Sequence, residues 1–490
     1  MTADRRTALW LLLIGVGWSA CFHHTRDWNS ASRLLLSHAM VQTHSIEVTP
    51  FVAVHGQLVR NPPTRDLASP DGQRYFSDKA PGQSLLGAAA LPLLKALKVA
   101  ADHPLATDSI ASQAERLSLR RTDYLLTVAT SGVCAGLAAA VVYLLLRRWN
   151  VGATTAAAAA LALEFASPWQ AYGALYYGHV AAGLFAVLAV WFFDADFDSS
   201  LRRLTAAFLA GLFAGLAVLV EYTMATLVIS IVLAAAITAL AARGRSRGRW
   251  DAAVAFLLGG LGPAMWLGWY HWRVTGDPFV PAYRYEVERD FAAVHAKGSG
   301  IPLSTLQPGA IFELPFGSSI GLVLFAPAVV WAVVGIVRLI SARPRVGWTA
   351  LFSVVFLLIV VACFPNWNGG LATGPRFLSP SLPVLFAAAG VAWDLASKQK
   401  VGRFLLAIST PIVVGAAILN TAMNAAGARK PFDLSINEFL RLSFGAPDRE
   451  RHMGDWLLSI LGVHASAVAA FAILAALAAV PIFVVLRRTR

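Results

Sequence analysis

The sequence has few charged residues. Only 14% of its 490 residues are Asp, Glu, Lys or Arg, whereas 57% are hydrophobic. Soluble domains carry about 25% charged residues. Apolar runs of 17 to 26 residues recur along the chain, and each can cross a hydrocarbon core about 30 Å thick. This composition excludes an ordinary soluble protein and predicts an all-α, polytopic membrane protein.

Cysteine and acidic residues are also scarce. The three cysteines, Cys21, Cys134 and Cys363, lie in or beside apolar segments, so we expect them to pack there rather than form disulfides or bind metal. The net charge of +13 does not indicate nucleic-acid binding, because the basic residues form short clusters between apolar runs. The positive-inside rule requires that placement in a membrane protein.

The basic clusters set the expected topology. Arg5 and Arg6 hold the N-terminus in the cytoplasm, and the later clusters divide the remaining spans into pairs. The expected arrangement has 12 spans and both termini inside. The spans are residues 7–23, 124–146, 151–168, 174–194, 204–220, 223–242, 251–270, 318–338, 347–364, 377–396, 403–422 and 461–486.

Residues 82–99 do not fit this scheme as a span. They read as a helix, but counting them would place the arginine pair at 147–148 outside. The segment also carries two lysines and an internal proline. We therefore expect an interfacial or re-entrant helix within a long outer loop, residues 24–123. The alternative has 13 spans and an inverted C-terminal half.

The polar residues lie mainly on the outer side, in segments 24–123, 271–317, 365–376 and 423–460. We therefore expect the chemistry to take place there. Residues 1–422 are predicted to form a catalytic membrane module, followed by an outer loop and a last helix in 423–490.

Two candidate sites lie in the first outer loop. Asp27 directly follows the first span and fits either a general base or the N-cap of the helix predicted over 28–42. The run Tyr75-Phe76-Ser77-Asp78-Lys79 precedes the helix over 82–99. Lys79 fits a phosphate ligand beside that helix N-terminus, or the run is only a turn before a capped helix.

Two further candidates lie later in the chain. Trp367 begins a glycine-rich segment that ends at Arg376, and an arginine on the outer side is either a headgroup anchor or a phosphate ligand. His179 closes an aromatic outer turn. Either the turn is part of the aromatic belt at the membrane interface, or His179 lines a pocket. Glu221 lies between two apolar spans, where an ionisable residue indicates the wall of a cavity.

At these residues the chain resembles the GT-C glycosyltransferases, near the protein O-mannosyltransferases and the lipid A aminoarabinose transferases. The resemblance rests on Asp27 after the first span, the run FSDKAPGQSLL, and the later WNGGLATGPRFLSPSLP, in that order. It covers most of residues 7–400. Many relatives carry a second acidic residue in the outer turn where this chain has His179, a departure that leaves metal use and acceptor class open.

The resemblance implies a fold and a reaction. It implies a GT-C-like fold and inverting transfer of a hexosyl or pentosyl group from a polyprenyl-phosphate donor to an acceptor hydroxyl on the outer face of the inner membrane. Asp27 would be the catalytic base, and Lys79, with Arg376, would bind the donor phosphate. Tyr75, Asp78, His179, Glu221 and Trp367 are expected to line the substrate site. We expect Asp27, Lys79 and Arg376 to converge on one cavity at the outer surface.

Other partners and functions are less well defined by the sequence. The acceptor is an envelope glycan, lipid or protein, and membrane lipids surround the chain. No cofactor is indicated, since no compact carboxylate cluster is visible that would hold a metal. The alternative function is a flippase or other transporter, which would place ionisable residues along several spans. Glu164 and Glu221 are the main mid-span acids.

Overall fold

The computed structural model describes most of the chain. The described residues are 2–23, 27–59, 62–99, 121–195, 199–241, 247–288, 292, 306–428, 430–445 and 455–456. The predicted last span, 461–486, lies outside them.

Helices occupy the other predicted spans, and eleven of the twelve expected segments contain one, three of them with only 13 to 15 residues. These helices are α1 (Ala3–Ala20), α6 (Val133–Arg148), α7 (Ala153–Phe165), α9 (His179–Phe193), α10 (Ser200–Val220), α11 (Ala225–Ala241), α12 (Arg247–Thr275), α16 (Val329–Ala342), α17 (Pro344–Ala362), α18 (Leu382–Ser397) and α19 (Lys400–Ala425). Seven helical stretches among the described residues are long and apolar enough to cross a membrane. The all-α, polytopic prediction is confirmed.

Short elements connect these helices. The π-helix η1 (Val128–Gly132) leads into α6, and Pro327 separates α15 from α16, which shortens the span expected over 318–338. The others are α8 (Trp169–Gly173), η2 (Tyr222–Met224), η3 (Ala282–Tyr285), α14 (Pro308–Phe316), α15 (Leu322–Phe325), η4 (Arg376–Ser381) and α20 (Ile436–Gly445).

Small residues allow the helices to pack closely. A Cβ atom on Gly136 of α6 would lie 2.4 Å from the carbonyl oxygen of Leu12 in α1, and one on Gly211 of α10 would lie 1.8 Å from that of Phe256 in α12. Glycine is therefore required where these backbones approach, as is common between membrane helices.

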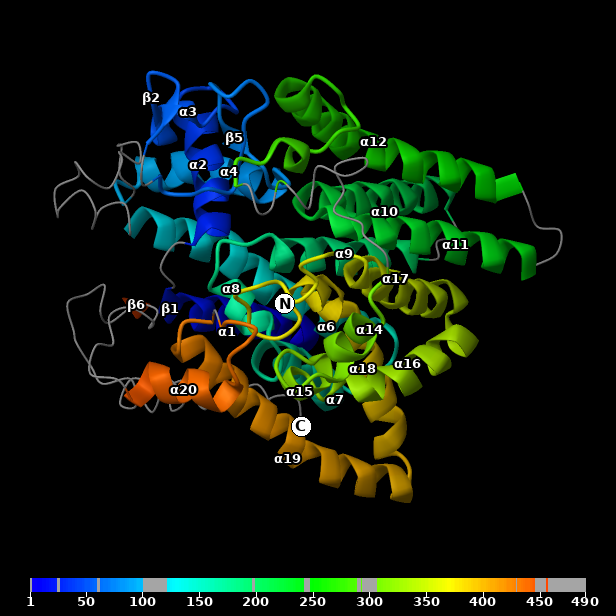
Figure 1. Cartoon of the computed structure of the whole chain (residues 1–490). Coiled ribbons are helices and arrows are strands. Elements are labelled where there is room, and N and C mark those ends of the chain that lie inside the picture. The colour runs from blue at the N-terminus through cyan, green and yellow to red at the C-terminus, as the bar shows by residue number, and fades with distance from the viewer. Residues whose placement is uncertain are drawn as a thin grey trace.

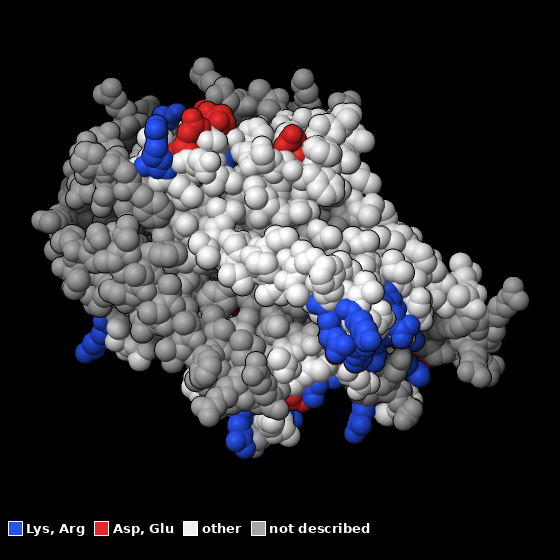
Figure 2. Space-filling model, turned by 90° about the horizontal axis from the view of Figure 1, so that it is seen from below, with Lys and Arg blue, Asp and Glu red and all other residues white. Residues whose placement is uncertain are grey.

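The lateral surface of the helix bundle, which would face lipid, is apolar. Leu257 on α12, Val333 on α16 and Phe404 on α19 are each 65–67% exposed. In Figure 2, the described part of one face is largely uncharged across its middle, with a group of Lys and Arg at one place and others near the edges. Exposed apolar side chains of this extent suit contact with lipid.

The described residues of the segment predicted as the first outer loop, 27–59 and 62–99, fold into short helices and hairpins beside the bundle (Figure 1). The segment contains α2 (Trp28–Gln42), α3 (Thr49–Val52) and α4 (Gly82–Ala96), with α4 packed against α2. Two short hairpins pair β2 (Ala53–Val54) with β3 (Gln57–Leu58), and β4 (Leu67–Ala68) with β5 (Phe76–Ser77). A third pair joins β1 (Phe22–His23) to β6 (Asp455–Trp456). The helix predicted over 82–99 is present, and its depth in the membrane stays a prediction.

Candidate functional site

Asp27 is the N-cap of α2. Its Oδ1 accepts hydrogen bonds from the Ser30 amide at 2.8 Å and from the Ser30 hydroxyl at 2.7 Å. The Ser30 hydroxyl in turn accepts from the Asp27 amide at 3.0 Å, which completes a capping box. The capping interpretation of Asp27 is therefore confirmed. The capping box engages mainly Oδ1 of Asp27, so Oδ2 faces the bundle.

Tyr177 contacts that second oxygen. Its hydroxyl donates a hydrogen bond to Asp27 Oδ2, and it comes from the aromatic turn between α8 and α9. The Tyr177 ring is stacked on Tyr172 and meets His179 edge-on, at centroid distances of 6.2 and 5.6 Å. The sequence indicated this turn through His179, but it did not single out Tyr177.

Arg376 lies over the Tyr177 ring. Its guanidinium is 5.9 Å from the Tyr177 ring centroid and 4.8 Å from that of Phe377, and its Nε makes no hydrogen bond to a described residue. Gly369 has a φ of +76°, and a Cβ there would lie 2.9 Å from the Arg376 side chain. The glycine thus lets the loop fold over the arginine, as the sequence suggested.

Arg33 joins α2 to Glu221. The Arg33 side chain, 3% exposed, donates to Glu221 Oε1 at 3.1 Å and to the Ala80 carbonyl at 3.1 Å. His179 Nδ1 lies 3.5 Å from the same Glu221 oxygen, too far for a strong hydrogen bond. Glu221 therefore supplies an acidic group beside His179. Burial raises the pKa of Glu221, and Arg33 and Arg376 oppose that shift.

Lys79 lies in a second polar group, where carboxylates surround its ammonium. Its Nζ is 2.8 Å from Asp78 Oδ2 and 2.9 Å from Asp66 Oδ2, and 5.2 Å from the Tyr283 ring centroid. Glu286 completes the group, since its carboxylate and those of Asp66 and Asp78 offer ligand atoms within 4.8 Å of one another. We call Asp66, Asp78, Lys79 and Glu286 the carboxylate–lysine cluster.

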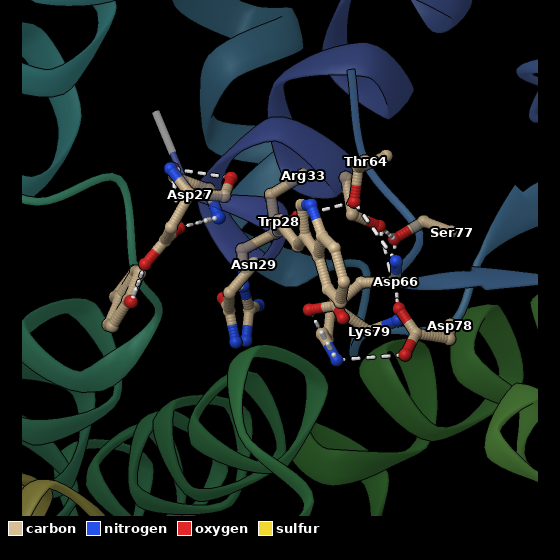
Figure 3. Close-up of polar contacts among 12 residues, drawn as sticks. Asp27, Trp28, Asn29, Arg33, Thr64, Asp66, Ser77, Asp78 and Lys79 are labelled. Atoms are coloured by element: carbon tan, nitrogen blue, oxygen red, sulfur yellow. Dashed lines mark hydrogen bonds and ion pairs between the residues drawn. The ribbon is translucent and has the colours of Figure 1, made fainter. Parts of the chain in front are cut away.

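A short hairpin assembles this cluster. Leu67 pairs with Ser77 across β4 and β5, so the residues just outside the pair, Asp66 and Asp78, lie opposite one another. A bridge from Ala68 to Glu286 adds the third carboxylate. The hydroxyl of Thr64 donates to the Trp28 carbonyl at 2.7 Å, which ties the hairpin to α2. Figure 3 shows Asp66, Asp78 and Lys79 on one side of the first turn of α2 and Asp27 on the other.

The expectation that no compact carboxylate group exists is wrong. The three acids are distant in sequence, and strand pairing joins them. Three carboxylates at this spacing are a ligand set for a divalent cation. The Lys79 ammonium already contacts two of the three, however, and supplies positive charge at the same place. A metal ion would have to displace it.

Burial changes the protonation of the cluster. It raises the pKa of Asp78 to about 6 and that of Glu286 to about 7, and Lys79 only partly offsets either shift. Burial opposes the charge on Lys79, but the Asp66 and Asp78 carboxylates outweigh it and hold the pKa of Lys79 well above its usual value. The lysine thus stays charged while the acids share protons near neutral pH.

The expected site residues are therefore only partly grouped. Asp27 and Arg376 both contact Tyr177. Glu221 lies close enough to Arg376 and Lys79 to interact with them electrostatically. Two other expected residues have packing roles. Tyr75 belongs to a buried apolar cluster of the outer loop, and Trp367 meets Phe432 edge-on at a centroid distance of 5.5 Å.

Comparisons with known proteins address the fold. No family model matches the chain, and no curated protein matches it either. Among solved structures, one match is ArnT from Cupriavidus metallidurans bound to undecaprenyl phosphate. The match covers 100% of this chain and 78% of the ArnT chain, at 15% sequence identity and a TM-score of 0.50. ArnT is a GT-C glycosyltransferase. The chain has the GT-C fold.

A second solved structure agrees with this assignment. The archaeal oligosaccharyltransferase AglB from Archaeoglobus fulgidus, in complex with an inhibitory peptide and a dolichol-phosphate, matches 91% of this chain and 58% of its own, at 14% identity and a TM-score of 0.50. The GT-C fold predicted from Asp27, FSDKAPGQSLL and WNGGLATGPRFLSPSLP is confirmed.

Proposed function

We propose that the chain is an inverting glycosyltransferase that moves a hexosyl or pentosyl group from a polyprenyl-phosphate donor to an acceptor hydroxyl on the outer face of the membrane. The observation that carries this proposal is the position of Asp27 on a GT-C fold. Its Oδ2 faces the Tyr177 hydroxyl, beside the guanidinium of Arg376. A carboxylate at the start of α2 and a cation thus lie against the same tyrosine.

Asp27 acts as the general base. As the acceptor oxygen attacks the anomeric carbon from the face opposite the phosphate, its proton moves to Asp27 Oδ2. The bond between that carbon and the phosphate oxygen breaks, and the lipid phosphate leaves with the electron pair. The Ser30 amide and hydroxyl hold Oδ1, so the carboxylate stays oriented while Oδ2 exchanges its Tyr177 partner for the acceptor.

Arg376 binds the donor phosphate. Its guanidinium rests on two aromatic rings, and its Nε has no partner among the described residues, so donors remain for phosphate oxygens. Lys79 contributes through its positive charge, because its ammonium is already held by Asp66 and Asp78. Growing negative charge on the leaving phosphate is stabilised by these fixed cations. Substrate contacts from Asp78, His179 and Glu221 belong to the same proposal.

This function places the chain in the inner membrane with both termini in the cytoplasm. The donor and an envelope glycan, lipid or protein acceptor are its partners, and no metal is required because Lys79 and Arg376 supply the positive charge.

The test uses the full chain in nanodiscs with a pool of polyprenyl-phosphate sugars. Release of the lipid phosphate together with a glycosylated acceptor, both followed by mass spectrometry, is the expected result. The Arg376→Met variant should lower release, while Arg441→Ala, an exposed arginine on α20, should not. Movement of the lipid-linked sugar across the bilayer without cleavage would contradict the proposal and favour a flippase.

A further inference from the structure

An open pocket lies beside residues 367–376, which we call the Arg376 loop. Its volume is about 710 Å³, within the range of about 300–1,000 Å³ typical of small-molecule sites. It is formed where α14, α15 and α19 meet the segment that leads into α20. Nothing in the proposed transfer chemistry uses this pocket.

The segment that leads into α20 is fixed to the Arg376 loop. The Ala372 amide donates to the Lys430 carbonyl at 3.0 Å, and the Thr373 hydroxyl donates to the Ala428 carbonyl at 2.8 Å. Phe432 in the pocket wall meets Trp367 of the same loop. Only the short turn from Trp367 to Gly369 separates this wall from the Arg376 side chain.

The pocket is lined by aromatic and neutral polar groups. Phe316, Leu419 and Phe432 give apolar surface. The side chains of Ser318, Asp433 and Asn437 also line it, and within the described part of the chain they form no hydrogen bond. Three unengaged polar groups around apolar walls match a ligand that has both hydroxyls and apolar faces.

The charge of the described lining disfavours an anionic ligand. Among the described residues, no lysine or arginine lines the pocket. The nearest cation on this wall, Lys430, is buried and turned inward, where its Nζ donates to Ser319 Oγ at 2.7 Å and to the Leu434 carbonyl at 2.6 Å. The one charged lining group is the exposed Asp433 carboxylate, which would repel a phosphate. A lipid phosphate or a phosphorylated glycan is therefore disfavoured.

We propose that this pocket binds an uncharged carbohydrate segment of the acceptor, with sugar faces on Phe316 and Phe432 and sugar hydroxyls on Asp433 and Asn437. This inference rests on the proposed function, because it assigns the acceptor class to that same reaction. Because Ala372 and Thr373 bond the pocket wall, a glycan held here lies next to the Arg376 loop.

The test measures binding by the full chain in nanodiscs, without donor. The probes are neutral oligosaccharides of glucose, mannose, arabinose and N-acetylglucosamine, with phosphorylated forms of each, followed by saturation-transfer NMR. At least one neutral probe should bind in a saturable way and more tightly than its phosphorylated form. Asn437→Ala should weaken that binding about 3- to 10-fold, the effect of one lost hydrogen bond. The control Arg441→Ala, on the same helix but outside the lining, should not.

Three results would overturn the pocket assignment: no saturable neutral probe, tighter binding of phosphorylated probes, or no loss in Asn437→Ala. Thermal unfolding of each variant confirms that it is folded, and Asn437→Asp, which keeps the size of the side chain, provides a second test of the same contact. Release of lipid phosphate by the wild-type chain is measured separately. Release without glycan binding rejects the pocket only, whereas absence of release with every acceptor rejects the proposed function.

Discussion

Replacement of Asp27 by asparagine separates the capping role seen in the structure from the proposed role as general base. Asparagine and aspartate rank nearly equally as N-caps, and an Asn oxygen can keep the 2.8 Å contact with the Ser30 amide. The substitution removes the negative charge and the basic Oδ2 that faces Tyr177. A capping role alone predicts a folded, active protein.

The expected magnitudes differ clearly. The cost in stability is at most that of a hydrogen bond to a charged group, about 1.5–3 kcal/mol, because the Asn amide can still bond to Tyr177. Loss of a general base lowers turnover by roughly 10²–10⁴-fold, which corresponds to about 3–5 kcal/mol in the activation barrier. Turnover per folded molecule should therefore fall far more than folding is affected.

The assay is transfer from a polyprenyl-phosphate sugar in membranes that contain each variant at matched levels. Asp71→Asn is the control, because Asp71 is an exposed carboxylate of the same loop that bonds the amides of Gln73 and Arg74 and lies outside the site. Tyr177→Phe should reduce transfer less than Asp27→Asn, since it keeps the base. Near-normal transfer by Asp27→Asn would refute the reasoning and leave Asp78 or His179 as the candidate base.

Three further predictions concern the cations and the carboxylate–lysine cluster. Lys79→Met should destabilise the protein by about 3–5 kcal/mol, because it leaves buried carboxylates without their cation; a lower unfolding temperature measures this. For Asp78 and Glu286, folding raises the pKa from 3.8 to about 6 and from 4.5 to about 7. The folded state therefore binds more protons in that window, and stability should fall as pH rises from about 4 to 7. Glu286→Gln should flatten the upper part of this fall in unfolding curves recorded from pH 4 to 8. Arg376→Met should lower kcat/KM for the donor about 10- to 100-fold, the loss of a hydrogen bond to a charged group, with a change in KM when donor concentration is varied.

The spans could be predicted from the sequence because their signal is local. A run of apolar residues with basic flanks contains everything needed to recognise a membrane helix. The segment 318–338 is the exception, because Pro327 ends the short α15 inside an apolar run, and the long helix begins only at Val329.

The hairpin that builds the carboxylate–lysine cluster also had a local signal that we did not use. Ser69-Pro70-Asp71-Gly72 is a turn sequence, and Gly72 has a φ of +73°. A hairpin closed there places Asp66 near Asp78. Glu286 carried no such signal, because its bridge to Ala68 joins residues far apart in the chain.

The role expected for Lys79 shows why a local motif was insufficient. The expectation combined a lysine with an open helix N-terminus, but the N-terminus of α4 is covered by α10. A Cβ on Gly82 would lie 2.6 Å from Val220 Cγ2 and 2.7 Å from the Leu219 carbonyl oxygen, so no phosphate can reach those amides. The ammonium itself turns to Asp66 and Asp78. To contact the Lys79 ammonium directly, a phosphate must displace the two carboxylates from it. Arg376 offers donors without such a displacement. Under the proposed function, the packing of α10 on α4 therefore assigns the direct phosphate contact to Arg376 rather than to Lys79.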